Sequence, residues 1–317
     1  MPQDIVVQAL KSLGFQGSIE KDFPLSNVVY YRIGGPADYF VCPKGEADIE
    51  IALKYFSKQK IPIQIIGGGT NLLVRDAGMR GAVIYLGTGL VGELQVLEEN
   101  DDEILIRIPA HWAKSQILKI ALEKSWAGLE FSAGIPGTLG GAVWMNAGTK
   151  WGSYENVIES VKFCHPEKGF YTKLKSELGL KYRGHGEGLL DAFTAIVSVD
   201  FRLKKTKDPG ASRRLVDEIL AYRGQRQPLE FANCGSVFKN PPNSERGAGR
   251  LIEAAGLKGK QIGQAMVSLK HANFISNLGK ATALDVETLI EFCQSEVEKK
   301  FGIRLEREVI LLGEKSN

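Results

Sequence analysis

The stretch GIPGTLGGAVWMNAG, residues 134–148, constrains the fold more than any other part of this 317-residue chain. It holds five glycines and no charged residue. Because each glycine loses extra backbone entropy on folding, neither a helix nor a strand favours such a composition. The run therefore indicates that the main chain approaches something closely, either a ligand or another stretch of backbone.

A second glycine run, IIGGGTNLLV at residues 65–74, follows the short apolar strand pattern IPIQII. Three consecutive glycines allow backbone amides to converge on an anion, and Thr70 and Asn71 add short donors. In the first run Thr138 offers a hydroxyl, and residues 142–145 supply an apolar wall. A tight turn and close backbone packing remain alternatives, but two such runs favour a large, flat, partly apolar ligand with a phosphate tail.

A third glycine motif, GTGLVG at 87–92, matches the dinucleotide-binding fingerprint after a strand pattern. That fingerprint binds a pyrophosphate only where a helix begins at the motif. The residues that follow, ELQVLEENDDEILIRI, alternate like a hairpin. The sequence therefore predicts a turn here and no dinucleotide site.

Helix and strand patterns alternate along the chain without an internal repeat. Apolar spacing predicts helices over 45–60, 113–125, 248–256 and 281–302, and strands over 61–66, 81–86, 102–110, 155–164, 192–203 and 303–313. Asp208-Pro209-Gly210 indicates a hinge before a further helix that ends at Gln227-Pro228. These patterns predict an α+β fold.

Composition excludes several classes of protein. A net charge of +3, from 40 basic and 37 acidic residues, gives no reason to expect a nucleic-acid partner. The four cysteines form no C-x-x-C pair, so neither a metal site nor a disulfide framework is expected. The N-terminal residues do not resemble a signal peptide, and no apolar run is long enough for a membrane span. We expect a cytoplasmic monomer that acts on small molecules.

The order of six motifs resembles the UDP-N-acetylenolpyruvoylglucosamine reductase (MurB) family, from about residue 26 to 313. The motifs are YRIGGPADYFV, IPIQIIGGGTNLLV, GLEFSAGIPGTLGGAVWMNAG, NCGSVFKNPP, AGRLIEAAGLKGKQIGQAMVSLKHANFISN and LEREVILLGE. The resemblance implies an FAD-binding part of the vanillyl-alcohol-oxidase/PCMH type and a C-terminal α+β substrate domain. It implies two FAD-binding subdomains at 1–86 and 87–221 and the substrate domain at 222–317. The short run 241–251 resembles the family type that lacks an extra tyrosine-bearing loop.

The same resemblance implies the cofactors FAD and NADPH and a reaction. NADPH reduces the flavin, and a hydride from flavin N5 then converts UDP-N-acetylglucosamine enolpyruvate to UDP-N-acetylmuramate in peptidoglycan precursor synthesis. The implied FAD-binding residues are Arg32, Ile66, Gly67, Gly68, Gly69, Thr70, Asn71, Leu72, Gly134, Ile135, Pro136, Gly137, Thr138, Gly140, Gly141 and Ala142.

Three residues are implied to be catalytic. Ser236, in NCGSVFKNP, is the implied proton donor, for which position matters more than acidity. Arg183, in KYRGH, is suited to holding a carboxylate on which charge develops. Glu308, in LEREVILLG, can donate a hydrogen bond to an enol in its protonated form, and Glu306 shares its face if the segment is a strand. Without the resemblance, a turn serine, a surface arginine and either glutamate would fit these positions equally well.

Five further residues are candidates for substrate binding. Arg223, Gln227, Lys239 and Asn240 provide donors for a diphosphate and a sugar, although each also fits a solvated side chain. His271 belongs to the motif KHANFISN with Asn273, but a histidine beside Phe274 and Ile275 is more often packed in a core.

The chain departs from the family pattern at two places. Gly184 and His185 follow Arg183 where the family usually has a serine nearby, and Cys234 replaces a smaller residue before Gly235, which would make the site sensitive to oxidation if the thiol were exposed. Two alternatives stay open: a flavin-dependent oxidase of the same fold acting on a sugar or hydroxy acid, and a non-catalytic protein that binds flavin or a nucleotide sugar. The absence of histidine from both glycine runs counts against a covalent flavin attachment, and the three catalytic candidates count against a mere binding protein.

Overall fold

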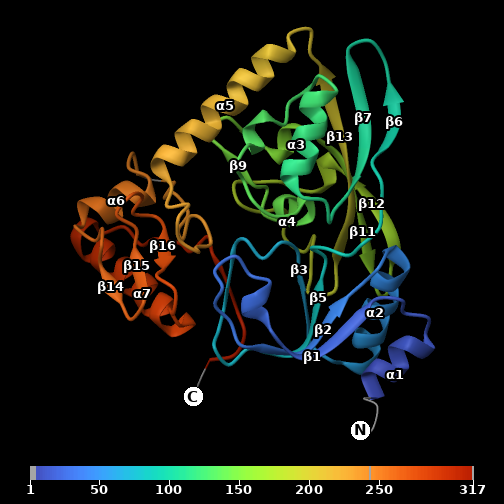
Figure 1. The fold of residues 1–317 in the computed structure, drawn as a ribbon, viewed down its shortest axis with the longest axis horizontal. Helices are drawn as coiled ribbons and strands as arrows, with labels where there is room; N and C mark the ends of the chain where they lie inside the picture. Colours follow the sequence, from blue (N-terminus) through green and yellow to red (C-terminus); the bar gives the residue numbers. More distant parts are fainter. Residues whose placement is uncertain (1–4, 243, 316–317) are drawn as a thin grey trace. The chain divides into compact units, whose positions relative to one another are not determined.

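The chain forms two compact units in a computed structural model that describes residues 5–242 and 244–315. Unit 1 comprises the described residues up to 21, 39–68 and 81–220, and unit 2 comprises 22–38, 69–80 and the described residues from 221 onward. Four elements contain a boundary between the units: β1 (Ser18–Pro24), β2 (Pro36–Cys42), β5 (Met79–Tyr85) and α5 (Pro209–Arg226). Figure 1 shows the course of the chain.

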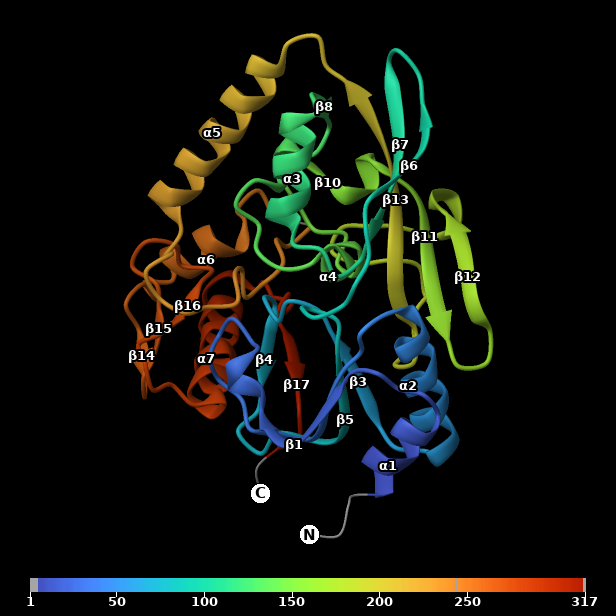
Figure 2. The same cartoon turned by 45° about the vertical axis from the view of Figure 1, so that its right-hand side comes forward.

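The largest sheet of unit 1 is antiparallel and has β13 (Ala195–Lys205) at its centre. Its order is β12-β11-β13-β7-β6, with β11 at Ile158–His165, β12 at Gly169–Leu174, β7 at Glu103–Pro109 and β6 at Gln95–Glu99. The short strand β8 (Trp126–Ala127) also pairs with β13. Nearly all of β13 is buried, as expected for a central strand whose faces are both covered, whereas every residue of the edge strand β6 is exposed. These strands lie side by side in Figures 1 and 2.

Short elements between the long strands of unit 1 shape the glycine-rich run. Helix α3 (Lys114–Glu123) buries Ile117, Leu118 and Ala121 in the core that covers this sheet. It is followed by η2 (Glu130–Ser132), α4 (Leu139–Trp144), β9 (Gly148–Thr149), β10 (Gly152–Ser153), η3 (Tyr154–Asn156) and, later, η4 (Lys175–Glu177). The run at 134–148 is thus neither a regular strand nor a long helix.

A second core of unit 1 surrounds α2 (Glu46–Gln59). Its buried Ile49, Ala52, Leu53 and Phe56 pack with residues of α1 (Ile5–Ser12) and of the parallel pair β3 (Ile63–Ile66) and β5. The sheet order is β1-β2-β5-β3. The helical spacing expected for 45–60 is confirmed, and Lys60 ends the helix in a left-handed conformation with φ +54°.

Unit 2 has one core, built around α7 (Ala283–Phe301). The helix begins at Thr282, whose side chain accepts a hydrogen bond from Asp285 N in a capping box, and ends at Gly302 with φ +67°. Its buried face packs with α6 (Ala248–Ala254) and with the antiparallel sheet β14 (Gln261–Ile262), β15 (Ala265–Val267) and β16 (Ile275–Asn277). The remaining elements are η1 (Leu25–Asn27) and the parallel pair β4 (Leu72–Val74) and β17 (Ile310–Leu312), which Figure 2 shows beside each other.

The predicted α+β fold is confirmed, and so is the hairpin after the GTGLVG motif, where β6 pairs with β7 and no helix starts. The strand expected over 303–313 is mostly wrong. Only Ile310–Leu312 forms a strand, because its partner β4 offers just three residues, whereas Arg307 forms an isolated bridge to Phe238. The expected hinge at 208–210 is also displaced, since α5 starts at Pro209, a residue well suited to the first turn of a helix. The three consecutive domain ranges stay a prediction.

Candidate functional site

The two glycine runs meet in unit 1. A Cβ atom added at Gly68 would lie 2.8 Å from Gly137 Cα, and one added at Gly67 would lie 2.3 Å from Thr138 Oγ1. Both distances are shorter than real contacts of a Cβ atom, and at Gly68 the opposing atom is main chain, which cannot rotate away, so glycine is required there. The main chain at 137–138 is held from its other side by α3, since Lys114 N donates to Gly137 O at 3.1 Å. Residues 67–68 of one run and 137–138 of the other therefore lie in close contact within unit 1.

The Thr138 hydroxyl lies in this contact without a partner. Thr138 is 6% exposed, and its Oγ1 makes no hydrogen bond with any described residue. It occupies the N-cap position of α4, yet its side chain does not cap the helix. A buried hydroxyl without a partner costs about 1–3 kcal/mol. The position thus fits a ligand that supplies the missing polar atom, as the phosphate end of FAD would.

A cavity of about 550 Å³ borders the first half of the glycine-rich run. Gly134, Ile135, Pro136 and Gly137 form one side, and Leu118 and Leu122 of α3 contribute to the apolar remainder. Four of the predicted FAD-binding residues therefore line one concave, mainly apolar space. Its size and lining fit part of a dinucleotide such as FAD.

Arg183 is anchored to the other end of the same run. Residues 181–184 form a tight turn closed by Lys181 N–Gly184 O and Gly184 N–Lys181 O hydrogen bonds of 3.0 and 3.1 Å, and Arg183 has φ +54°. Arg183 Nη2 donates to Gly148 O at 2.9 Å, and Asn146 Nδ2 donates to Lys181 O at 3.1 Å. The half-buried Arg183 is therefore no surface arginine at a strand end.

His185 packs against the same run. Its ring meets that of Trp144 edge-on, with centroids 5.4 Å apart. His185 is thus held by an aromatic contact two residues after Arg183.

In unit 2 the end of the second glycine run, residues 65–74, lies beside Glu308. Gly69 packs against the main chain of Val28 and Val29, where a Cβ atom would lie 2.5 Å from Val28 O. Asn71 Nδ2 donates to Glu308 O at 3.0 Å, and Asn71 O accepts from Ile310 N at 3.0 Å. The predicted FAD-binding residues 69–72 and the predicted catalytic Glu308 are thus directly connected.

Ser236 lies on the segment next to Glu308. Val237 O accepts from Glu308 N at 2.8 Å, and Gly235, with φ +81°, donates its N–H to Asn233 Oδ1 at 3.0 Å. The Ser236 side chain is half-buried, and its hydroxyl makes no hydrogen bond with any other described residue. Unit 2 therefore brings together Ser236, Glu308 and the end of one glycine run, whereas Arg183 belongs to unit 1.

Cys234, two residues before Ser236, is buried at 3% exposure. Burial raises the pKa of its thiol to about 12, and the nearby Glu308 carboxyl contributes to the rise. The thiol shares a hydrogen bond with Tyr31, whose hydroxyl donates to Ile275 O at 2.8 Å. A buried thiol with a raised pKa is unreactive, so the sensitivity to oxidation considered for an exposed Cys234 does not arise.

The substrate-binding candidates in unit 2 differ in their burial and in the groups that they contact. Lys239 forms an ion pair with the exposed Glu306, 2.5 Å between Nζ and Oε1. Asn240 Oδ1 accepts from Ala248 N at the start of α6. Burial lowers the pKa of Arg223, and Gln227 lies just after α5.

His271 packs as the alternative interpretation expected. Its Nδ1 accepts from Asn273 N at 3.2 Å, its ring meets that of Phe274 edge-on at 4.9 Å, and burial lowers its pKa. Arg32, with φ +55°, is exposed between the buried Tyr31 and Ile33.

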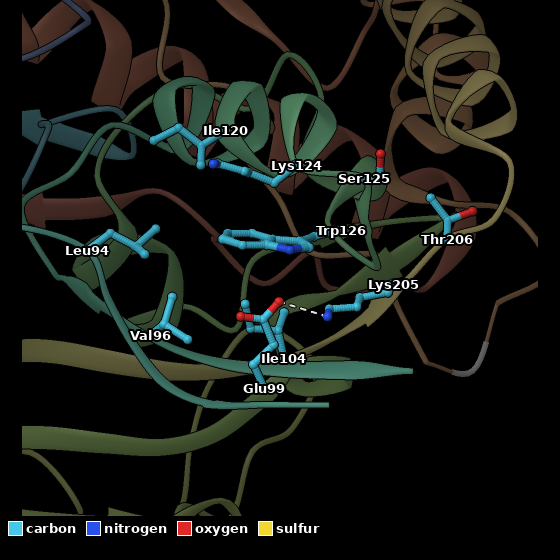
Figure 3. Close-up of a pocket in the computed structure, with 10 residues that line it drawn as sticks. All are labelled: Leu94, Val96, Glu99, Ile104, Ile120, Lys124, Ser125, Trp126, Lys205 and Thr206. Carbon is cyan, nitrogen blue, oxygen red and sulfur yellow. Dashed lines mark ion pairs between the residues drawn. The ribbon is translucent and has the colours of Figure 1, made fainter. Parts of the chain in front are cut away.

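A further cavity of about 600 Å³ in unit 1 carries none of the predicted residues. In Figure 3 the Trp126 ring lies at its centre, between Ile120 and Lys124 on one side and the Glu99–Lys205 ion pair of 2.7 Å on the other. Sequence reasoning missed this cavity because its apolar lining follows ordinary core patterns. The full lining is Leu94, Val96, Glu99, Ile104, Ile120, Lys124, Ser125, Trp126, Lys205 and Thr206.

Two family profiles match this chain. The family profile for the FAD binding domain matches residues 37–173, and that for the C-terminal domain of UDP-N-acetylenolpyruvoylglucosamine reductase matches residues 227–312. The reductase of Listeria monocytogenes is 40% identical over 298 residues, covering 94% of this chain and 96% of the relative. The reductase of Staphylococcus aureus is 37% identical and covers 98% and 97%.

A solved structure shows the same similarity. The MurB crystal structure from Thermus caldophilus has a TM-score of 0.76 at 30% identity and covers 94% of this chain and 100% of that one. Within residues 5–242 and 244–315, no helix is long and apolar enough to cross a membrane. From the two matched profiles and the near full-length relatives, the chain belongs to the UDP-N-acetylenolpyruvoylglucosamine reductase family, FAD-dependent oxidoreductases of peptidoglycan synthesis that use NADPH.

Proposed function

We propose that this chain reduces the enol ether of UDP-N-acetylglucosamine enolpyruvate to the lactyl ether of UDP-N-acetylmuramate, with Ser236 as the proton donor. The observation that carries the proposal is the available Ser236 hydroxyl on a segment whose neighbours are fixed on both sides. A small neutral hydroxyl is a weak acid, but a carbanion-like carbon is a strong base, so position decides the rate of proton transfer.

The proposed FAD site combines both glycine runs. Gly67, Gly68, Gly134, Gly137, Gly140 and Gly141 leave the main chain bare, and the Thr138 hydroxyl donates to a phosphate oxygen. Gly69, Thr70, Asn71 and Leu72 continue the second run, with Arg32 as an exposed cation for the same ligand. Ile66, Ile135, Pro136 and Ala142 complete the apolar part of the site. Bound FAD, once reduced by NADPH, supplies the hydride.

Arg183 and Glu308 would stabilise the charge that develops next to the substrate carboxylate. A guanidinium holds a carboxylate through two parallel hydrogen bonds, and the contact of Arg183 with Gly148 O fixes its direction. Glu308 in its protonated form donates a hydrogen bond to the enol oxygen. Its main chain is held by Val237 and Asn71, so the carboxyl is attached to the same framework as Ser236.

The nucleotide part of the substrate needs donors for a diphosphate. We assign these to Arg223, Gln227, Lys239, Asn240 and His271, all in unit 2. Lys239 would exchange its contact with the exposed Glu306 for a phosphate oxygen, which is a modest cost because surface ion pairs contribute little. The lowered pKa of Arg223 results from burial, and an anion in the same place would offset the cost of that burial.

The domain bounds, the oligomeric state and the cellular compartment complete the proposal. We propose FAD-binding subdomains at 1–86 and 87–221 and a substrate domain at 222–317, in a monomer that works in the cytoplasm. All four cysteines are free thiols, and three of them are buried, which suits a reducing compartment.

Colour changes of the flavin test the function directly. The purified protein should be yellow, bleach anaerobically with NADPH and regain its colour when the enolpyruvyl nucleotide is added. Recovery with O₂ and not with the nucleotide would favour the oxidase, and a colourless protein that cannot take up FAD would exclude both flavin enzymes.

Ser236→Ala tests the assigned proton donor. Reduction of the flavin by NADPH should stay within about twofold, whereas re-oxidation by the nucleotide should slow by roughly 10²- to 10⁴-fold, the usual contribution of a general acid. Stopped-flow absorbance at the flavin band measures both half-reactions. Equal re-oxidation rates in the variant and the parent protein would remove Ser236 from this role.

A further inference from the structure

One side of the segment after Ser236 is held by Asn273. Asn273 lies in the loop 268–274 between β15 and β16 and is 5% exposed. Its Oδ1 accepts from Phe238 N at 3.0 Å, and its Nδ2 donates to Phe238 O at 2.8 Å. Its main-chain oxygen also accepts from Val237 N at 2.8 Å. One residue thus makes three hydrogen bonds to the two residues that follow Ser236.

These contacts replace a neighbouring strand. Val237 and Phe238 have the segment 306–309 on one side, through Glu308 N–Val237 O at 2.8 Å and the bridge between Phe238 and Arg307. On the other side no strand of the described chain pairs with Phe238, and the Asn273 amide provides both the acceptor and the donor that a strand would provide. An asparagine amide presents one acceptor and one donor side by side at any pH, whereas an aspartic acid of the same length does so only when protonated.

The loop that carries Asn273 is held by its own hydrogen bonds, so Asn273 can hold Phe238 in a defined position. Its N–H donates to His271 Nδ1 at 3.2 Å, and the loop is closed by Phe274 N–His271 O at 3.0 Å and Ser268 N–Phe274 O at 2.8 Å. Upstream of Ser236, Asn233 holds Gly235 N in the same manner. Ser236 therefore lies between two segments that are fixed by buried amide side chains, while its own hydroxyl has no bond to another described residue.

We propose that Asn273 is a positioning residue that holds Ser236 where its hydroxyl can deliver a proton. This rests on the proposed function, because it presupposes that Ser236 is the donor. Proton transfer to carbon depends steeply on distance and alignment, and a misplacement of about 1 Å costs on the order of 10²-fold in rate. The sequence motif KHANFISN contained this residue without indicating what it does.

A double-mutant cycle distinguishes positioning from a general structural role. Asn273→Leu keeps the shape of the side chain and removes both amide contacts. In the parent protein it should slow re-oxidation of the flavin by the enolpyruvyl nucleotide by about 10²-fold, with reduction by NADPH nearly unchanged. In the Ser236→Ala background the same substitution should change re-oxidation less than about threefold, because no donor is left to position.

A second variant and a control separate this effect from lost stability. Asn273→Asp has an acceptor facing Phe238 O when ionised and a donor there when protonated, so its re-oxidation rate should recover relative to the parent protein as the pH falls. Asn277→Leu removes another buried amide of unit 2, whose Nδ2 donates to Tyr31 O at 3.1 Å, and should lower the melting temperature with a much smaller effect on re-oxidation.

Two results would overturn the proposal. If Asn273→Leu slows re-oxidation equally with and without Ser236, the residue acts only on the fold. If Ser236→Ala itself re-oxidises at the parent rate, the assignment of the donor fails, and the positioning role fails with it. The first result leaves the proposed function intact, so the two failures are distinguishable.

Discussion

The backbone is held in place by opposite means in the glycine-rich region of unit 1 and in the Ser236 region of unit 2. Around Gly67, Gly68 and Gly137 the side chains are absent and two backbones touch. Around Ser236 the backbone is held by buried amides of Asn233 and Asn273. In the glycine-rich region the buried Thr138 Oγ1 has no partner among the described residues, and in the Ser236 region the same holds for the half-buried hydroxyl of Ser236. The two regions thus reach a fixed backbone by different means, one by omitting side chains and the other by adding side-chain hydrogen bonds.

The largest effect should come from breaking the backbone contact. In Gly68→Ala the new methyl group would lie 2.8 Å from Gly137 Cα, and main chain cannot rotate away as a side chain can. We expect a loss of about 1–3 kcal/mol in the free energy of unfolding. We also expect purified protein with little FAD, as measured by the ratio of flavin to protein absorbance.

Gly224→Ala is the matched control for that substitution. Gly224 lies in α5 with no atom within 4 Å of an added Cβ, so alanine should raise stability by up to about 1 kcal/mol through its higher helix propensity. Neither glycine has a positive φ, which leaves the space around the Cβ as the difference. Normal FAD content in Gly68→Ala would contradict the proposed enclosure.

A smaller effect is expected for Thr138→Val, which should weaken FAD binding without lowering the stability of the FAD-free protein. Valine keeps the shape and removes the buried hydroxyl, so the protein without FAD should be unchanged or stabilised by about 1 kcal/mol. FAD should bind roughly tenfold more weakly, corresponding to one lost hydrogen bond to a charged group. Titration of the FAD-free protein followed by flavin fluorescence measures the affinity.

Ser198→Ala provides the comparison in the same unit. Ser198 on β13 is also buried with a hydroxyl that has no partner among the described residues, but it belongs to neither glycine run. Its substitution should leave FAD affinity unchanged. Equal affinities in the Thr138→Val and Ser198→Ala proteins would show that the Thr138 hydroxyl does not contact the cofactor.

The smallest effect concerns the pH dependence of unit 2. Burial lowers the pKa of His271, with Lys258 and Arg226 nearby acting in the same direction and Glu253 against it. The unfolded chain therefore binds a proton at higher pH than the folded chain. Stability should fall as the pH drops below about 6.5, with a slope of at most about 1.4 kcal/mol per pH unit, until the folded-state pKa is reached.

His271→Gln should flatten this part of the stability curve, as measured by urea denaturation between pH 7.5 and 5. Burial also lowers the pKa of His111 in unit 1, so His111→Gln is needed to separate the two contributions. A curve that His271→Gln leaves unchanged would show that the pKa of His271 is the same in the folded and unfolded chain.

Features of the fold that depend on neighbouring residues could be predicted from the sequence, whereas features that depend on contacts between distant residues could not. The apolar spacing of α2 and α7 and the capping residues Thr282 and Gly302 are adjacent in the sequence, so both helices were predictable. That Gly68 meets Gly137 was not, because no local pattern records a contact across about seventy residues. The irregular course of 303–309 depends on a partner segment at 237–239, and the ion pair of Lys239 with Glu306 follows from that pairing.

The parallel pair β4–β17 has a consequence for synthesis of the protein. Asn71 and Leu72 emerge from the ribosome early, but their partners Glu308 and Ile310 are added some 240 residues later. Domains generally fold as they emerge, N-terminal parts first. Residues 72–74 therefore have no β17 partner, and one strand edge stays unpaired, until residues 310–312 have been translated. During this interval a chaperone that covers the open edge would be most useful.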